Sequence, residues 1–115
     1  MRGLVRNTLK SSVAIGLLFN AAFVNAESLS SYELVAKEGR LIPETVRVAA
    51  GQRFKIVVRN EGHDAVEFES TDLKKEKVLA PGATSFVVIA PLKPGSYRFF
   101  DDFHPDTGTG RIVVE

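Results

Sequence analysis

The feature that most constrains the fold is a strict alternation of apolar and polar residues in short runs. The clearest run covers residues 53–60, where the apolar residues Phe54, Ile56 and Val58 alternate with other residues that include Arg53, Lys55 and Arg59. A period of two places the apolar residues on one face of a strand. Turn residues interrupt such runs about every ten positions, and no long helical pattern occurs. The sequence therefore predicts an all-β Greek-key sandwich of seven or eight strands.

The expected strands follow these runs in chain order. They cover residues 32–37, 45–48, 53–60, 65–69, 76–79, 85–89, 97–100 and 111–114. Pro43 cannot donate to a central ladder, so residues 41–43 are expected to cross a sheet edge. Residues 70–75 are expected to hold a short helical turn.

The N-terminus carries the pattern of a secretory signal peptide. Arg2, Arg6 and Lys10 precede an apolar stretch over residues 13–24, and Ala26 ends a short small-residue spacing. We predict a signal peptide over residues 1–26 and one mature domain over residues 27–115. The apolar stretch is shorter than the ~20 residues of a membrane span. An uncleaved membrane anchor remains the alternative.

The charge of the mature part argues against nucleic acid and anionic lipid as partners. Three of the 15 basic residues lie in the predicted signal peptide, which leaves 12 against 14 acidic residues, a net charge of −2. Such a chain has no basic field to attract polyanions. We also expect no direct membrane insertion after signal cleavage. The chain has no cysteine, so neither a disulfide nor a thiolate metal ligand is available.

The segment YRFFDDFHPDTGTG, residues 97–110, contains the densest group of candidate functional residues. It resembles the ligand loop of a cupredoxin, which has the pattern Y-x-F-x-C-x-x-H-P-x-M-x-G. His104 and Pro105 match that pattern. Asp101 stands at the cysteine position and Thr107 at the methionine position. A blue-copper centre requires a thiolate, so this chain cannot form one.

Further motifs extend the resemblance over nearly the whole mature chain. They are Asn60-Glu61-Gly62, Glu67-Phe68-Glu69, Glu76-Lys77-Val78, Ala80-Pro81-Gly82, Pro94-Gly95-Ser96-Tyr97 and Gly110-Arg111-Ile112-Val113. Together they resemble the EfeO-type cupredoxin-like family, small periplasmic components of bacterial iron-uptake systems. The resemblance implies a cupredoxin-like sandwich in the periplasm. It also implies an inner-membrane iron permease, a periplasmic iron-binding protein, or both, as partners.

The resemblance also indicates where a metal ion would bind. Many relatives have a copper-ligating histidine where this chain has Val66, so only His104 of the four blue-copper positions is retained. In the cupredoxin fold the loop after residue 100 and the strand beginning near residue 65 lie at the same end. The candidate metal ligands are therefore His104, Glu67, Asp102, Asp101 and Glu69. His63, Asp64 and Glu76 are weaker candidates, and Glu76 is expected to pair with neighbouring lysines. Asp106 is expected to cap the turn at Thr107 and Gly108.

Imidazole and carboxylate ligands suit an iron or copper ion, whose identity the sequence leaves open. The leading hypothesis is a periplasmic metal-binding protein that helps to load iron into a high-affinity permease. The alternatives are a metal-free partner-docking module and a copper-handling protein. Neither histidine has a serine or cysteine at a catalytic spacing, so nothing indicates a hydrolase. An accessory role in the oxidation of ferrous iron stays open.

The predicted signal peptide makes the first testable prediction. Protein recovered after export should begin at Glu27, because signal peptidase cleaves after a small residue such as Ala26. Intact-mass spectrometry of the exported chain measures this directly. Retention of residues 1–26 would favour the membrane anchor.

Overall fold

The computed structural model describes residues 29–115, so the predicted signal peptide and its cleavage site lie outside the described residues. Within this part the chain forms strands without any helix, which confirms the all-β prediction. The strands are β1 (Ser30–Lys37), β2 (Arg40–Ile42), β3 (Thr45–Val48), β4 (Phe54–Asn60), β5 (Val66–Ser70), β6 (Lys75–Leu79), β7 (Thr84–Ile89), β8 (Gly95–Asp101) and β9 (Thr109–Val114). One strand more than expected is present, because the short segment β2 pairs with β1.

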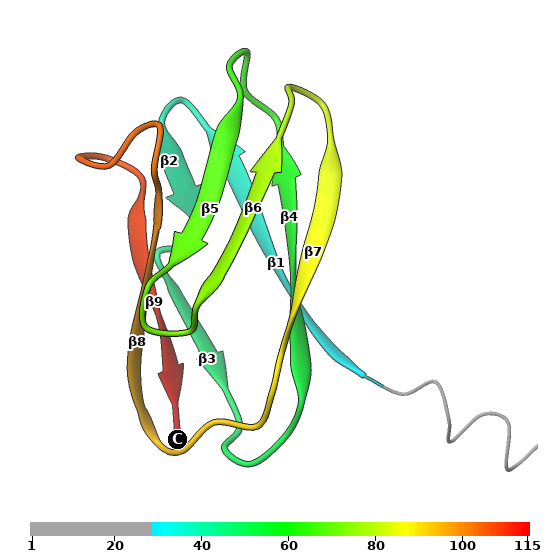
Figure 1. Cartoon of the computed structure of the whole chain (residues 1–115), viewed down its shortest axis with the longest axis vertical. Helices are drawn as coiled ribbons and strands as arrows, with labels where there is room; N and C mark the ends of the chain where they lie inside the picture. The colour runs from blue at the N-terminus through cyan, green and yellow to red at the C-terminus, as the bar shows by residue number, and fades with distance from the viewer. Residues whose placement is uncertain (1–28) are drawn as a thin grey trace, which may run out of the picture.

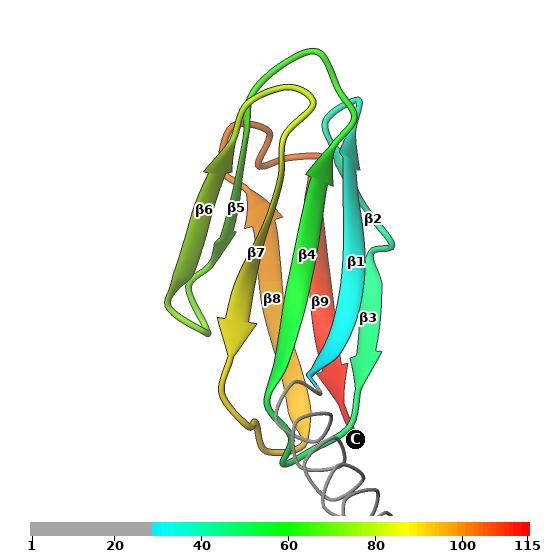
Figure 2. The same cartoon turned by 90° about the vertical axis from the view of Figure 1, so that its right-hand side faces the viewer.

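The strands form two sheets that pack face to face (Figure 1). One sheet has the order β2-β1-β4-β7, and the other has the order β3-β9-β8-β5-β6. Figure 2 shows the two layers from the side, with β1, β4 and β7 in one and β5, β6 and β8 in the other. The chain leaves the first sheet after β2 at Pro43, as the sequence predicted, and β3 begins the second sheet two residues later.

Both sheets contain a parallel pairing that the alternation pattern does not reveal. β1 runs parallel to β4, with Leu34 opposite Val58, and β3 runs parallel to β9, with Val46 opposite Ile112. All four of these residues are buried. The parallel pairs therefore bring apolar residues far apart in sequence into the same core.

The core follows the alternation. Phe54, Ile56 and Val58 of β4 are at most 1% exposed, and the residues between them face outward. In the opposite sheet the rings of Phe68 and Phe99 lie 5.7 Å apart. Burial of such side chains from water is the main source of stability for a sandwich without disulfides.

The segment expected to form a helical turn is instead the tight turn of the β5–β6 hairpin. Ser70 is buried and its hydroxyl donates to the Arg98 carbonyl at 2.6 Å. The same oxygen accepts the Leu73 backbone N–H at 3.2 Å. No helix within residues 29–115 is long and apolar enough to cross a membrane.

Asn60, at the end of β4, anchors the loop that follows it. Its side chain is 1% exposed, and its amide donates to the carbonyls of Asp64 at 2.8 Å and Leu79 at 3.2 Å. Its side-chain oxygen accepts the Gly62 N–H at 2.9 Å. A buried polar side chain is tolerated when its hydrogen bonds are satisfied in this way. Asn60 thus fixes the β4–β5 loop against β6.

Replacement of Asn60 by alanine should lower the free energy of unfolding by about 2–3 kcal/mol, because it leaves buried backbone groups without partners. Chemical denaturation of the metal-free protein measures the change. Arg53→Ala, an exposed substitution just before the same strand, is the control and should stay within about 0.5 kcal/mol. Equal effects of the two substitutions would argue against the anchoring role.

Candidate metal centre

Three loops meet at the end of the sandwich where β5 begins and β8 ends. They are the β1–β2 turn at Glu38 and Gly39, the β4–β5 loop, and the β8–β9 loop, which projects from the body (Figure 1). Phe68 pairs with Asp101, and the Asp102 N–H donates to the Glu67 carbonyl at 2.9 Å. This geometry confirms that the two segments predicted to share one end of the fold do so.

A buried carboxylate, that of Asp101, organises the β8–β9 loop. Asp101 is 1% exposed. Its Oδ1 accepts the backbone N–H groups of Glu67 and Phe103, each at 3.0 Å. Its Oδ2 lies 2.7 Å from Nδ1 of His104. Three hydrogen bonds to one carboxylate stabilise a charge that burial alone would disfavour.

The rest of the loop packs tightly around this carboxylate. The Gly108 N–H donates to the His104 carbonyl at 2.9 Å, and the Asp101 N–H donates to the Gly108 carbonyl at 2.7 Å. A Cβ at Gly108 would lie 2.8 Å from the Asp101 Cβ, so only glycine fits there. The Thr107 hydroxyl donates to the Gly39 carbonyl at 2.6 Å and so joins the loop to the β1–β2 turn.

A second group of acidic residues lies on the outer face of the five-stranded sheet. Glu67 and Glu69 alternate outward from β5, and Glu69 stands opposite Glu76 of β6. Carboxylate oxygens of these three residues lie within 4.8 Å of one another. Within residues 29–115 this is the only group of three or more acidic or histidine residues with that spacing. The neighbouring Asp102 begins the loop beside Glu67.

Burial and the neighbouring negative charges both act on the carboxyl of Glu67. Partial removal from water is the largest cause that raises the pKa of the Glu67 carboxyl above its ordinary value, and the negative charge of Asp102 is the next. The charges of Glu76 and Glu69 raise it further. Like charges this close disfavour ionisation unless a proton or a cation compensates them.

The structure divides the predicted ligands between two places. His104 and Asp101 belong to the loop end, whereas Glu67, Glu69 and Asp102 belong to the outer face. Asp101 and Asp102 separate because consecutive residues of an extended chain project to opposite sides.

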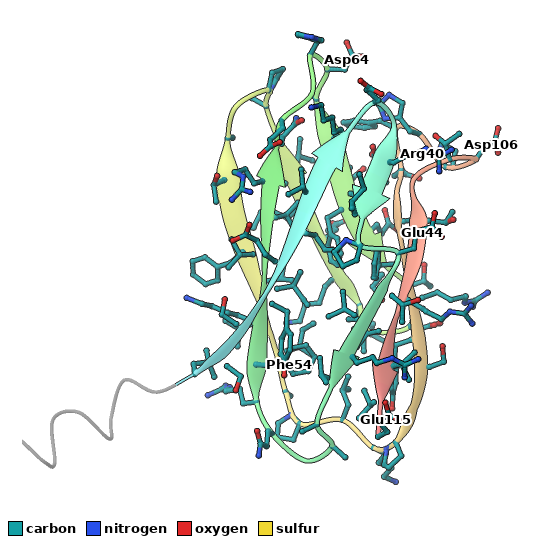
Figure 3. The ribbon with its side chains drawn as sticks, turned by 180° about the vertical axis from the view of Figure 1, so that it is seen from behind. Arg40, Glu44, Phe54, Asp64, Asp106 and Glu115 are labelled. Carbon is teal, nitrogen blue, oxygen red and sulfur yellow. The ribbon has the colours of Figure 1, made fainter. Side chains whose placement is uncertain are left out.

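The weaker candidates are also divided between the outer face and the loop end. Glu76 joins the outer-face carboxylates, and no ion pair within residues 29–115 links it to a lysine, contrary to expectation. His63 and Asp64 lie in the β4–β5 loop. Figure 3 shows Asp64 and Asp106 at the tips of two different loops. The sequence analysis did not identify Asn60 as the residue that holds the β4–β5 loop. Its place at the start of the Asn60-Glu61-Gly62 motif is the feature that could have indicated this role.

A two-sheet sandwich with a His-Pro loop between its last two strands defines a protein of the cupredoxin class. Comparison with known proteins agrees: the model of the cupredoxin-like domain family matches residues 10–114, so the chain belongs to this family. An uncharacterized protein of Rickettsia prowazekii (strain Madrid E) is 34% identical over 88 residues, which cover 76% of this chain and 70% of that protein.

Solved structures show the same fold at low sequence identity. Reduced auracyanin from Roseiflexus castenholzii superposes with a TM-score of 0.65 at 15% identity, over 76% of this chain and 99% of that protein. Auracyanin A from Chloroflexus aurantiacus, described as a "blue" copper protein, gives a TM-score of 0.64 at 16% identity, over 76% of this chain and all of that one.

The residues at the loop end do not fit the copper centre that this class implies. No thiolate is available, and Asp101 at the cysteine position is already satisfied by three donors. Val66 is apolar and 5% exposed, and the Thr107 hydroxyl is bonded to Gly39. Nδ1 of His104 is bonded to Asp101. A direct contact between the Asp101 carboxylate and the His104 imidazole therefore joins the two residues that stand at the cysteine and histidine positions of the loop pattern.

Replacement of Asp101 by alanine should lower the free energy of unfolding of the metal-free protein by about 3 kcal/mol, because two backbone N–H groups and one imidazole lose a buried partner. Denaturant unfolding measures this loss. Asp106→Ala, in the same loop but exposed at its tip, should change stability by less than about 0.5 kcal/mol. A small effect at Asp101 would show that the loop does not depend on its carboxylate.

Proposed function

We propose that this chain is an exported periplasmic protein that binds a metal ion through oxygen ligands and presents it to an iron-uptake system. The observation that carries this proposal is the outer-face group of Glu67, Glu69 and Glu76, whose carboxylate oxygens lie within 4.8 Å of one another. Three carboxylates at this spacing form an oxygen-rich site suited to a hard cation, and iron is the cargo we assign to it.

The electrostatics of the outer face support cation binding. The carboxyl of Glu67 has a raised pKa because it is partly withdrawn from water and adjoins Asp102, Glu76 and Glu69. A bound cation would relieve this repulsion, so part of the cost of bringing the carboxylates together becomes binding free energy. Asp102 adds a further negative charge beside Glu67.

The position of the carboxylates supports a role in transfer rather than storage. β6 is the edge strand of its sheet, and Glu76 on it is exposed. An ion held on an open sheet face can be reached by a second protein without unfolding of the first. The partners we propose are an inner-membrane iron permease, a periplasmic iron-binding protein, or both, as the EfeO-type resemblance implies.

A metal-free docking module is the second candidate function. The observation that favours it is that hydrogen bonds from two backbone N–H groups and the contact with His104 hold the carboxylate of Asp101 in the β8–β9 loop. The loop needs no ion to hold its shape, so it could serve only as a rigid contact surface. Metal titration of the outer-face variants distinguishes the two functions.

Calorimetric titration of the exported protein with Fe²⁺, Mn²⁺ and Cu²⁺ tests the metal site. Glu67→Gln and Glu69→Gln should each weaken binding at the outer face by about tenfold or more, because each removes a charged ligand. Glu44→Gln is the matched control, since Glu44 is exposed and pairs with Arg40 outside the cluster. Unchanged binding of all three ions by both variants would leave the docking function as the better reading.

A strain of the source organism that lacks this chain tests the link to iron. Uptake of radiolabelled iron at low external concentration should fall in that strain and be restored by the wild-type gene. The Glu67→Gln gene should restore it only in part. Normal uptake without the chain would contradict the assignment to iron transport.

The raised pKa of Glu67 predicts that Glu67→Gln, which weakens metal binding, stabilises the metal-free fold. A raised folded-state pKa means that the fold favours the neutral carboxyl. That contribution is fully present below the unfolded-chain pKa, near 4.3, and is lost as the pH rises through the higher folded-state value. Glu67→Gln should therefore gain stability relative to wild type between about pH 4 and pH 7 in the absence of metal. Thermal unfolding across this range measures the gain, and a constant difference would argue against the crowding.

A further inference from the structure

A hollow of about 470 Å³ lies on the outer face of the five-stranded sheet, where β3, β9 and β8 run side by side. Two arginines line it, Arg98 from β8 and Arg111 from β9, and they stand directly opposite each other in the ladder. Both are exposed, whereas Phe99 and Ile112, which follow them in sequence, are buried in the core. The two guanidinium groups therefore share one outward surface.

The two positive charges are compensated to different extents. Arg98 forms an ion pair with Asp72, with Nη2 3.3 Å from Oδ1, and its side chain stays 81% exposed. Within residues 29–115 no ion pair includes Arg111. Like charges directly opposite each other in a ladder repel, since their Cβ atoms are only about 5 Å apart. An anion bound between the two arginines would offset this repulsion.

Donors for such an anion are present on both arginines. A guanidinium carries N–H groups on three nitrogens, and Arg98 directs Nε and Nη2 toward Asp72, so Nη1 is left for a second partner. The one acidic residue that lines the hollow, Glu44, pairs with Arg40 at 3.7 Å. Three residues with hydroxyl side chains also line it: Thr45, Ser96 and Thr109. The hollow thus offers charged and neutral donors to an oxyanion.

The hollow adjoins the outer-face carboxylates on the same sheet. Glu69 of β5 stands opposite Phe100 of β8, and Arg98 precedes Phe100 by two residues on the same face. From the usual strand spacing and rise, the Cα atoms of Glu69 and Arg98 lie roughly 8 Å apart. Side chains of this length can contact one small molecule across that distance. The outer face is therefore negative over β5 and β6 and carries its arginines on β8 and β9.

We propose that this hollow is an anion subsite, which takes a small metal-chelating polyanion with carboxylate or phosphate groups through Arg98 and Arg111. Arginine recognises both kinds of group through the same planar pairs of hydrogen bonds. The inference rests on the proposed function, because it states how the metal ion reaches Glu67, Glu69 and Glu76. The ion arrives as a complex with the polyanion, whose remaining oxygens bind the two arginines.

Calorimetric titration of the exported protein with citrate and with pyrophosphate, at constant ionic strength, tests the subsite. Arg111→Gln should weaken binding of the preferred anion by at least about tenfold, because it removes a charged donor pair. Arg53→Gln is the matched control and should leave binding unchanged, since Arg53 is exposed, has no ion pair within residues 29–115 and precedes β4 of the other sheet. The anion that binds more tightly identifies the group that the subsite prefers.

Thermal unfolding separates a binding role of Arg111 from a structural one. Arg111→Gln removes one charge of a like-charged pair, so it should not lower the melting temperature of the anion-free protein. The preferred anion should raise the melting temperature of the wild type clearly more than that of the variant, because only the wild type binds it well.

The metal site is tested separately, by titration with Mn²⁺ without a chelator. Arg111→Gln should bind Mn²⁺ at least as tightly as the wild type, whereas Glu67→Gln should bind it more weakly. Both substitutions should weaken binding of the Fe³⁺–citrate complex. Equal affinity of the wild type and Arg111→Gln for citrate and for pyrophosphate overturns the anion subsite. Equal Mn²⁺ affinity of the wild type and Glu67→Gln would instead contradict the proposed function.

Discussion

The loop end of the sandwich depends on the burial of one carboxylate. Asp101 is withdrawn from water at the last position of β8, and a buried charge persists only where donors surround it. The fold supplies them from β5 and from the β8–β9 loop itself. The same three bonds set the shape of the loop, the orientation of His104 and the close packing of Gly108. In this chain a hydrogen-bonded carboxylate therefore joins the loop to the sheet.

The hydrogen bonds of Asp101 and His104 limit which donor atoms at the loop end could bind a metal ion. Asp101 is buried and already takes part in three hydrogen bonds within the protein, so it is poorly suited to ligate an ion directly. Nδ1 of His104 is bonded as well. Donors that remain available face outward: Nε2 of His104 toward the pocket between the three loops, and the carboxylates of Glu67, Glu69 and Glu76 on the sheet surface. The histidine nitrogen and the carboxylate oxygens thus lie on different surfaces of the sandwich.

Alternation was sufficient to predict most of the strands and their buried faces. Period two placed Phe54, Ile56 and Val58 on one face of a strand, and that face is buried in the core. The candidate site was harder to predict. Glu76 was expected to pair with lysines that adjoin it in sequence, but its register places it opposite Glu69. Gly108 and Gly110 are each required because other atoms occupy the space of a Cβ, and no local pattern reveals this.

The sequence by itself determined the class of fold, the absence of a thiolate centre and the residue types available to bind an ion. These follow from local alternation and from composition, which need no knowledge of distant contacts. Only the tertiary structure decided which donors meet. The parallel pairing of β1 with β4 and of β3 with β9, and the approach of Asp101 to Glu67, join segments far apart in the chain. Such contacts depend on how the two sheets assemble, so no local pattern specifies whether a carboxylate ends as a buried hydrogen-bond acceptor or as an exposed ligand.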